Sequence, residues 1–473
     1  MWKLPAGHAA RPVFARASQS AVLWGLLATS LRLFSGVLVL PLVVRRLPSD
    51  HLGLWYVFLS LQGIAALFDL GFSPAVTRAA GYLWAGATEL RRFGVAIQSS
   101  AAADTQPNYA LLSGLVATMK LYYRFFGAAS ALVMLIGGGS WIWVKTQNLP
   151  DANTLRACYF VFVIGGFLTA TGDLWPALLS GINAVRAAQK ILLGSGVINL
   201  LVVTIGLLAG LKIWALVLGV IGSGLFIRLA GRKIFLDRAG PQLSRKNRPQ
   251  FDLITTLWPT AWRSGLVSLG GYLVLSANTL ICSAFLDLKT TASYGLSLTV
   301  IGVLNTVSAT FTNIKIPFTN QLRALGQTEQ IATVWIQRTR VSLLFYAMGA
   351  IFLLIVGRPA FELIGSKTMP LPNAQLAVAV LIIGLEMHHV LYAILIISEN
   401  QNPFVIPALL SGVATVVLSI LLTPRLGIWG MLIAQGCTQA AFNNWWTVYR
   451  GIRGLGLSVP EYWRRYIQTP FSI

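Results

Sequence analysis

Long apolar runs separated by short polar segments repeat along the whole chain of 473 residues. Each run approaches the roughly 20 apolar residues that an α-helix needs to cross a bilayer. The second run is longer than a span requires, and we expect it to bend near Gly71 and Pro74. The runs predict twelve membrane-spanning helices, over 20–43, 53–77, 124–144, 157–180, 191–211, 212–229, 262–286, 291–314, 341–358, 374–397, 403–423 and 427–448.

The two halves of the chain look like weak repeats of six spans each. Gly53-Leu54-Trp55-Tyr56 begins the second run, and Tyr294-Gly295-Leu296-Ser297 begins the eighth. Near the ends of the halves, Leu211-Lys212-Ile213-Trp214-Ala215 resembles Leu426-Gly427-Ile428-Trp429-Gly430. A parallel repeat of this kind is typical of transporters. We therefore divide the chain into an N-terminal lobe (1–235), a basic linker (236–256) and a C-terminal lobe (257–473).

Composition supports an all-α, polytopic membrane protein. Hydrophobic residues make up 56% of the chain and charged residues only 11%, whereas soluble domains carry about 25% charged residues. The formal net charge is +22, but the Lys and Arg residues lie between the apolar runs, which argues against nucleic-acid binding. With the N-terminus in the cytoplasm, the inner side holds 26 of them and the outer side 9.

This bias predicts a multi-pass membrane protein with both termini in the cytoplasm. We also expect basic contacts to membrane lipids. The longest stretches between spans, 78–123, 230–261 and 315–340, lie on the inner side, and each is expected to form a helix on the membrane surface. The outer loops are short, so they offer no room for a catalytic domain.

Ionisable residues inside spans are costly and are the best functional candidates. Arg32 lies in the middle of the first run, on a stripe of small and polar residues. It either faces a cavity that binds substrate or forms a structural ion pair. Asp173 has a similar small-residue stripe in the fourth run, and a pair with Arg32 is one interpretation of it.

Glu386 and His389 lie three residues apart in the tenth run, on one helix face. They either form a proton relay or make a neutral hydrogen-bonded pair that joins two helices. Asp69 and Arg263 lie nearer the ends of their spans, where snorkelling is the default for an arginine. Asn278 in the seventh run is explained equally well by a packing hydrogen bond or by a site.

The sequence contains no GxxxxGK[ST] loop and no HExxH motif. We therefore expect neither ATP hydrolysis, nor enzymatic activity, nor a bound cofactor or metal. A gradient of protons or sodium, or the membrane potential itself, is the expected energy source.

Several motifs resemble those of polysaccharide-biosynthesis flippases, the O-antigen and exopolysaccharide translocases of the superfamily that includes multidrug exporters and lipid II flippases. The resemblance starts at 47–56 (Leu-Pro-Ser-Asp-His-Leu-Gly-Leu-Trp-Tyr) and continues through Phe68-Asp69-Leu70-Gly71-Phe72 and Arg78. Leu178-Leu179-Ser180-Gly181-Ile182-Asn183 and the stretch from Tyr294 through Pro317, Arg323 and Gly326 agree with it. Many relatives carry an acid where this chain has Asn278.

This resemblance implies a protein of the bacterial inner membrane with two six-helix lobes around a central cavity that opens alternately to each side. The implied cargo is an oligosaccharide on a polyprenyl diphosphate, with a polysaccharide polymerase and a chain-length regulator as further partners. Arginine suits a diphosphate because its fork pairs two oxygens at once. The expected substrate site comprises Arg32, Asp69, Arg78, Asp173, Arg263, Asn278 and Arg323, with Glu386 and His389 for ion coupling. An ion-coupled multidrug exporter of the same superfamily is the main alternative. A polytopic glycan polymerase or ligase is a less favoured one, because it would need a large outer loop.

Overall fold

The computed structural model describes residues 38–92, 106–240, 243, 248–399 and 403–468. All regular structure in these ranges is helical. Ten helices within them are long and apolar enough to cross a membrane. They confirm ten of the twelve expected spans. The first expected span falls mostly outside the described residues, and the last, 427–448, is helical but carries Gln435, Gln439, Asn443 and Asn444, and it is not among the ten.

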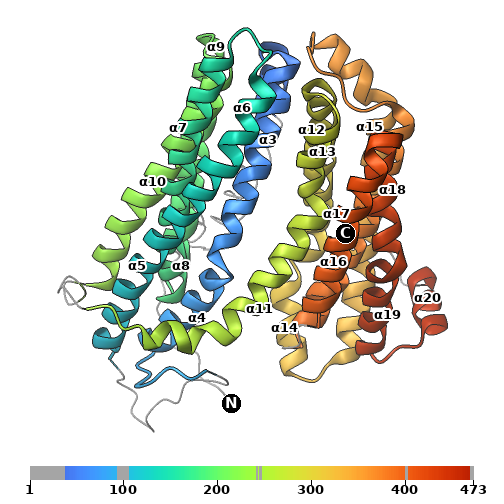
Figure 1. Ribbon diagram of the computed structural model, residues 1–473. Helices are drawn as coiled ribbons and strands as arrows, with labels where there is room; N and C mark the ends of the chain where they lie inside the picture. The colour runs from blue at the N-terminus through green and yellow to red at the C-terminus, as the bar shows by residue number, and fades with distance from the viewer. Residues whose placement is uncertain (1–37, 93–105, 241–242, 244–247, 400–402, 469–473) are drawn as a thin grey trace, which may run out of the picture.

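The helices form two lobes that stand side by side (Figure 1). The first lobe contains α3 (Ser49–Ala66), η1 (Leu67–Asp69), α4 (Phe72–Trp84), α5 (Tyr109–Val133), η2 (Met134–Gly138), α6 (Gly139–Thr146), α7 (Ala152–Gly172), α8 (Leu174–Gly181), α9 (Val185–Leu208) and α10 (Ile213–Ala239). The second contains α11 (Asp252–Leu275), α12 (Ala277–Phe285), α13 (Leu288–Asn313), α14 (Ile316–Ala324), α15 (Thr328–Leu363), α16 (Asn373–Ile397), α17 (Val405–Leu426), α18 (Ile428–Thr438), η4 (Gln439–Asn443), α19 (Asn444–Gly454) and α20 (Val459–Gln468).

The lobes meet at one end of the bundle through α3 and α13. There the two helices pack closely because each contributes a glycine: Gly53 faces the backbone of Leu288, and Gly295 faces the ring of Tyr56. The Tyr56 hydroxyl also lies 3.3 Å from Thr299 Oγ1. We call this end the outer end, because it holds the short loops that we expect on the outer side. The opposite end is called the basic end.

Helix α11 links the lobes at the basic end, where it crosses the view in Figure 1. Its first half belongs to the core of the first lobe, since Leu253, Leu257 and Ala261 pack in the same cluster as Phe72. Its second half packs against α17 in the other lobe, where Gly270 touches the backbone of Ala408. Within the expected linker 236–256, α10 covers 236–239 and α11 covers 252–256, and the crossing between the lobes lies inside α11.

The expected bend in the second span is confirmed. The helix ends at Asp69, Leu70 and Gly71 take left-handed backbone angles (φ 48° and 74°), and α4 then begins. Pro74 lies in the first turn of α4, where a proline causes no loss of a helical hydrogen bond. Gly71 also lies against the backbone of Ala261, a contact that a side chain would block.

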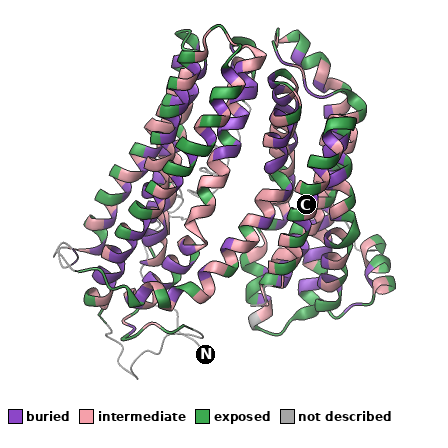
Figure 2. Cartoon of the chain, in the orientation of Figure 1, coloured by how far each residue is buried: buried purple, intermediate pink, exposed green. Residues whose placement is uncertain are grey.

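Apolar side chains cover the outside of both lobes, as expected for a surface in contact with lipid. Figure 2 shows exposed residues alternating with buried ones along the spans. Only 22% of the apolar window of α17 and 28% of that of α9 are buried inside the protein. In the described parts of 78–123, 230–261 and 315–340, the expected surface helices are not found. Their described parts mostly extend the spans, as in α5, α10 and α15, because these helices continue past the apolar runs.

Candidate functional site

A polar cavity of about 460 Å³ lies inside the first lobe and brings two predicted carboxylates together. Asp69 reaches it from the end of η1, and Asp173 reaches it from the junction of α7 and α8. The two side chains are close enough for their charges to interact. Tyr123 and Gln189 add polar groups to the lining. Two carboxylates in one site favour binding of a cation or sharing of a proton.

Helix breaks place both acids. Asp69 precedes the left-handed turn at Leu70 and Gly71. Asp173 lies between α7 and α8, three residues before Pro176, which also lines the cavity. A proline cannot donate the hydrogen bond that would continue a helix through its position. Each carboxylate therefore sits at a local helix terminus, where the backbone is available to polar ligands.

Hydrogen bonds fix the Asp69 side chain. The Tyr123 hydroxyl donates to Oδ1 of Asp69 at 2.6 Å, and the backbone N–H of Ser73 donates to Oδ2 at 3.2 Å. The neighbouring Tyr122 hydroxyl donates to the Asp69 carbonyl at 3.2 Å. Asp173 is exposed to the cavity instead. The pair thus combines one held carboxylate with one that faces the cavity.

A second cavity of about 710 Å³ lies in the other lobe between α13 and α16. Glu386 of α16 lines it, opposite a polar face of α13 that includes Asn305, Thr306 and Asn313. Oε2 of Glu386 is buried and makes no hydrogen bond to any residue that the structure describes. An unpaired buried carboxyl is expensive, so this group marks the cavity as a second candidate ion site.

His389 is held by the helix bundle one turn away. Its Nδ1 lies 2.8 Å from the carbonyl of Asn443 in η4. The Asn443 amide in turn donates to Ser411 Oγ at 2.7 Å and to Gln439 Oε1 at 3.0 Å. His389 therefore joins α16 to the polar last span. It remains close enough to Glu386 for their charges to interact.

Arg78 lies in a small basic pocket of about 230 Å³ at the basic end. Arg91 and Arg92 line the same pocket, together with Thr256 and Thr260 of α11. Arg91 is also paired with Glu89 at 3.0 Å, and both side chains are exposed. Three guanidinium groups line one pocket between α4 and α11, and this arrangement suits an anion because each group offers several donors.

The remaining predicted site residues lie apart from these cavities. Arg263 is exposed on α11 with its guanidinium 5.5 Å from the Trp262 ring. Asn278 is fully buried, and its Nδ2 lies 3.5 Å from Gln435 Oε1. Arg323 is paired with Glu399 at 3.0 Å. These contacts are structural in character, and the structure does not bring the three residues together. Arg32 lies outside the described residues.

Sequence reasoning missed Tyr123, Gln189, Asn305 and Asn313. Tyr123 lies one residue before the predicted third span, 124–144, and so was not considered as a residue inside the membrane. In the structure, α5 begins earlier, at Tyr109. Asn305, Thr306 and Asn313 share a face of the eighth span at positions i, i+1 and i+8. A search for polar stripes within spans could have found them.

No protein-family model matches the chain, and no curated protein of similar sequence is found. Solved structures do match. The chain resembles the inward-facing conformation of a multidrug resistance MATE family transporter of the MOP superfamily, with a TM-score of 0.65, 12% identity, and coverage of 91% of this chain and 98% of that one. It also resembles the lipid II flippase MurJ in an inward closed conformation, with a TM-score of 0.60, 11% identity, and coverage of 95% and 90%.

The outward-facing conformation of a MATE family transporter gives a TM-score of 0.55, at 12% identity and with coverage of 94% of this chain and 98% of that one. The arrangement of the lobes is therefore more similar to the inward-facing structure than to the outward-facing one. This agrees with the tight α3–α13 contact at the outer end. The chain thus has the polytopic helical fold of these transporters and flippases.

Proposed function

We propose that this chain is an ion-coupled, alternating-access transporter of the inner membrane. The observation that carries the proposal is the pairing of Asp69 and Asp173 in one cavity of the first lobe. Carboxylates inside a membrane are retained at a cost and mark ion pathways. Glu386 provides a similar group in the other lobe. A cation bound between the two aspartates would link the helix breaks of α3–α4 and α7–α8 to the state of the transporter.

The proposed cargo is an oligosaccharide on a polyprenyl diphosphate. Its support is the basic pocket of Arg78, Arg91 and Arg92 at the end expected to face the cytoplasm. A diphosphate with about two negative charges that leaves an inside-negative cell gains roughly 4–5 kcal/mol per 100 mV. Arg32 remains a predicted part of the path, and its substitution by Ala should abolish export.

Two sets of variants test the proposal. Asp69→Asn and Asp173→Asn should each abolish transport, because the neutral amide cannot bind or release the coupling ion. Asp237→Asn is the control, since this acid is exposed on α10. In a deletion strain, lipid-linked oligosaccharide should accumulate on the inner leaflet, and only wild type and the control should clear it. Full clearance by both aspartate variants would contradict the coupling role.

A multidrug exporter is the second candidate, and the same acidic cavity favours it, because cationic drugs bind carboxylates. The basic pocket distinguishes the two candidates. Replacing Arg78 and Arg92 with Gln should block clearance of the lipid-linked glycan if the cargo is a diphosphate. It should leave resistance to cationic drugs unchanged if the cargo is a drug. A strain that gains drug resistance from the wild-type chain and shows no glycan defect on deletion would establish the exporter instead.

A further inference from the structure

The last helix, α20 (Val459–Gln468), lies beside the second lobe at the basic end (Figure 1). It has ten residues and is too short to cross a membrane. Its side chains divide into an inner face that contacts the lobe and an outer face that is exposed. The two faces have different chemistry, and the outer face is not explained by transport.

The inner face is anchored by aromatic residues. Tyr462 is only 2% exposed, and its hydroxyl lies 2.5 Å from that of Tyr392 on α16. Burial raises the pKa of Tyr462 to about 12, so the phenol is neutral in this contact. Tyr466, one turn on, lies with its ring 5.3 Å from the guanidinium carbon of Arg340 on α15. Helix α20 is thereby held against both α15 and α16.

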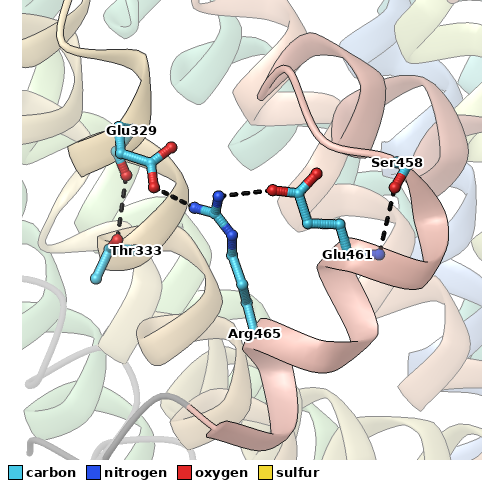
Figure 3. Close-up of polar contacts among 5 residues, drawn as sticks. All are labelled: Glu329, Thr333, Ser458, Glu461 and Arg465. Atoms are coloured by element: carbon cyan, nitrogen blue, oxygen red, sulfur yellow. Dashed lines mark hydrogen bonds and ion pairs between the residues drawn. The ribbon is translucent and has the colours of Figure 1, made fainter.

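Two ion pairs of Arg465 add to this anchoring. Figure 3 shows Arg465 of α20 between Glu329 of α15 and Glu461 of its own helix. Arg465 Nη2 donates to Glu461 Oε1 at 2.7 Å, and Nη1 donates to Glu329 Oε1. Ser458 accepts the backbone N–H of Glu461 at 3.3 Å and so caps the start of the helix. The orientation of α20 about its own axis is therefore fixed.

The position of these contacts along the spans gives the depth of α20. Tyr392 lies five residues before the end of α16 at Ile397, which is roughly 7–8 Å at 1.5 Å per residue. On α15, Arg340, which lies against the Tyr466 ring, directly precedes the apolar run that begins near Val341. Helix α20 thus lies at the level where the apolar part of the bundle ends. Interfacial helices bury their apolar face about 5–10 Å into the same layer.

The outer face combines an apolar stripe with a cation. Pro460, Trp463 and Ile467 are exposed and follow one another at spacings of three and four residues. Trp463 is 55% exposed and Ile467 75%. Arg464 is exposed beside them, and Arg453 is exposed at the end of α19. Tryptophan next to Lys or Arg is typical of the membrane–water boundary.

We propose that the outer face of α20 is a docking surface for anionic lipids of the leaflet at the basic end. Trp463 and Ile467 insert at the boundary between headgroups and acyl chains, and Arg464 pairs with the phosphate of an acidic headgroup. The net charge of +22 and the excess of basic residues at this end complement such a leaflet. Because Arg465 and Tyr462 fix the helix to α15 and α16, a lipid bound here contacts the second lobe alone.

A protein partner is a weaker explanation of this face. The stripe is formed by a few side chains of a ten-residue helix, whereas specific protein interfaces bury about 1,200–2,000 Å² in total. The stripe also lies on a helix that packs against two spans, α15 and α16, whose exposed apolar surfaces are expected to face lipid. The membrane therefore covers the outer face without any second protein.

Lipid binding to the purified full chain tests the proposal. The protein is titrated in detergent with dioleoylphosphatidylglycerol or dioleoylphosphatidylcholine, and retained lipids are counted by native mass spectrometry. Arg464→Gln should lower retention of the anionic lipid at least threefold and leave the zwitterionic lipid unchanged. Trp463→Ser with Ile467→Ser should lower retention of both. The matched controls are Arg425→Gln and Trp429→Ser, because these residues are exposed near the outer end, where α17 meets α18.

A label on the helix gives a second readout. In a Cys437→Ser background, nitroxides at Ile467→Cys and Ser458→Cys are compared in phosphatidylglycerol nanodiscs. The label at 467 should collide with oxygen more than with an aqueous nickel reagent, and the label at 458 should do the opposite. Equal aqueous access at both positions would overturn the proposal. So would unchanged retention of both lipids by the variants, or a label at 467 shielded from both reagents, as a protein partner would cause.

Discussion

Gly295 of α13 packs directly against the ring of Tyr56 on α3. A Cβ atom at position 295 would lie 2.4 Å from two ring carbons, which is closer than side-chain atoms approach. Gly53, one turn before Tyr56, makes a similar approach to the carbonyl of Leu288. The two repeated motifs of the sequence thus face each other across the lobes. Their glycines allow the outer end to close.

Substitution of Gly295 by Leu should open the outer end. The larger side chain cannot fit against Tyr56, and overpacking costs about 1–3 kcal/mol, or roughly 5–150-fold in the ratio of closed to open states. Spin labels at Gln147 and Lys289, both exposed near this end, should report a longer distance by pulsed electron resonance. Gly302→Leu is the control, because no atom lies within 4 Å of its added Cβ. An unchanged distance in Gly295→Leu would count against this contact as the closure.

Tyr123→Phe should destabilise the first lobe. It removes the hydroxyl that donates to Asp69 at 2.6 Å, and a hydrogen bond to a charged group contributes about 1.5–3 kcal/mol. The melting temperature in detergent should fall by several degrees. Tyr109→Phe, a tyrosine that packs edge-on against Trp84, provides the comparison. In an Asp69→Asn background the effect of Tyr123→Phe should shrink, and additive effects would show that the two groups do not interact.

Glu386→Gln should separate stability from transport. Oε2 of Glu386 is buried without a partner in the part of the chain that the structure describes, and a neutral amide costs less to bury than an ionised carboxylate. The melting temperature should therefore rise while coupled transport is lost. Normal transport with a raised melting temperature would leave Glu386 without a coupling role. A lower melting temperature would show that the Glu386 carboxylate has a stabilising hydrogen-bond partner.

Lys212→Gly should stabilise the fold. Lys212 precedes α10 at φ 49° and ψ −128°, and Gly427 precedes α18 at φ 59° and ψ −136°. These two positions belong to the second pair of repeated motifs, and the backbone conformation is one that only glycine adopts easily. Relief of the strain should add about 1 kcal/mol to the free energy of unfolding. Gly427→Ala should lower the free energy of unfolding. Lys212→Ala removes the charge but keeps the backbone strain, so it should not stabilise the fold as Lys212→Gly does.

Docking of α20 should weaken at high pH. The pKa of Tyr462 is raised from 10 to about 12 in the docked helix, so the undocked phenol ionises first. The contribution of this contact is complete below about pH 10 and is lost as the pH rises toward 12. Hydrogen exchange of α20 amides, corrected for the intrinsic rate, should show this loss in wild type. It should be absent in Tyr462→Phe, and a loss below pH 9 would contradict the assignment.

Much of the helical architecture could be predicted because span length and apolar composition are local properties. The bend after Asp69 was also predictable, since Gly71 and Pro74 are local signals. The motif pairs at Tyr56 and Gly295, and at Lys212 and Gly427, were visible as repeats. The structural role of these repeats could not be predicted. Sequence similarity between two motifs does not show that they touch across the lobes or that they share a backbone conformation.

The sequence by itself determined that this is a helical membrane protein with two halves and with costly charges inside its spans. Only the tertiary structure decided which of those charges meet. It joins Asp69 to Asp173 and Tyr123, pairs Arg323 with Glu399, and leaves Glu386 facing a cavity. The physical reason is that apolar periodicity fixes which residues enter the membrane, whereas helix breaks and packing rotate each span and so choose the neighbours of every polar group.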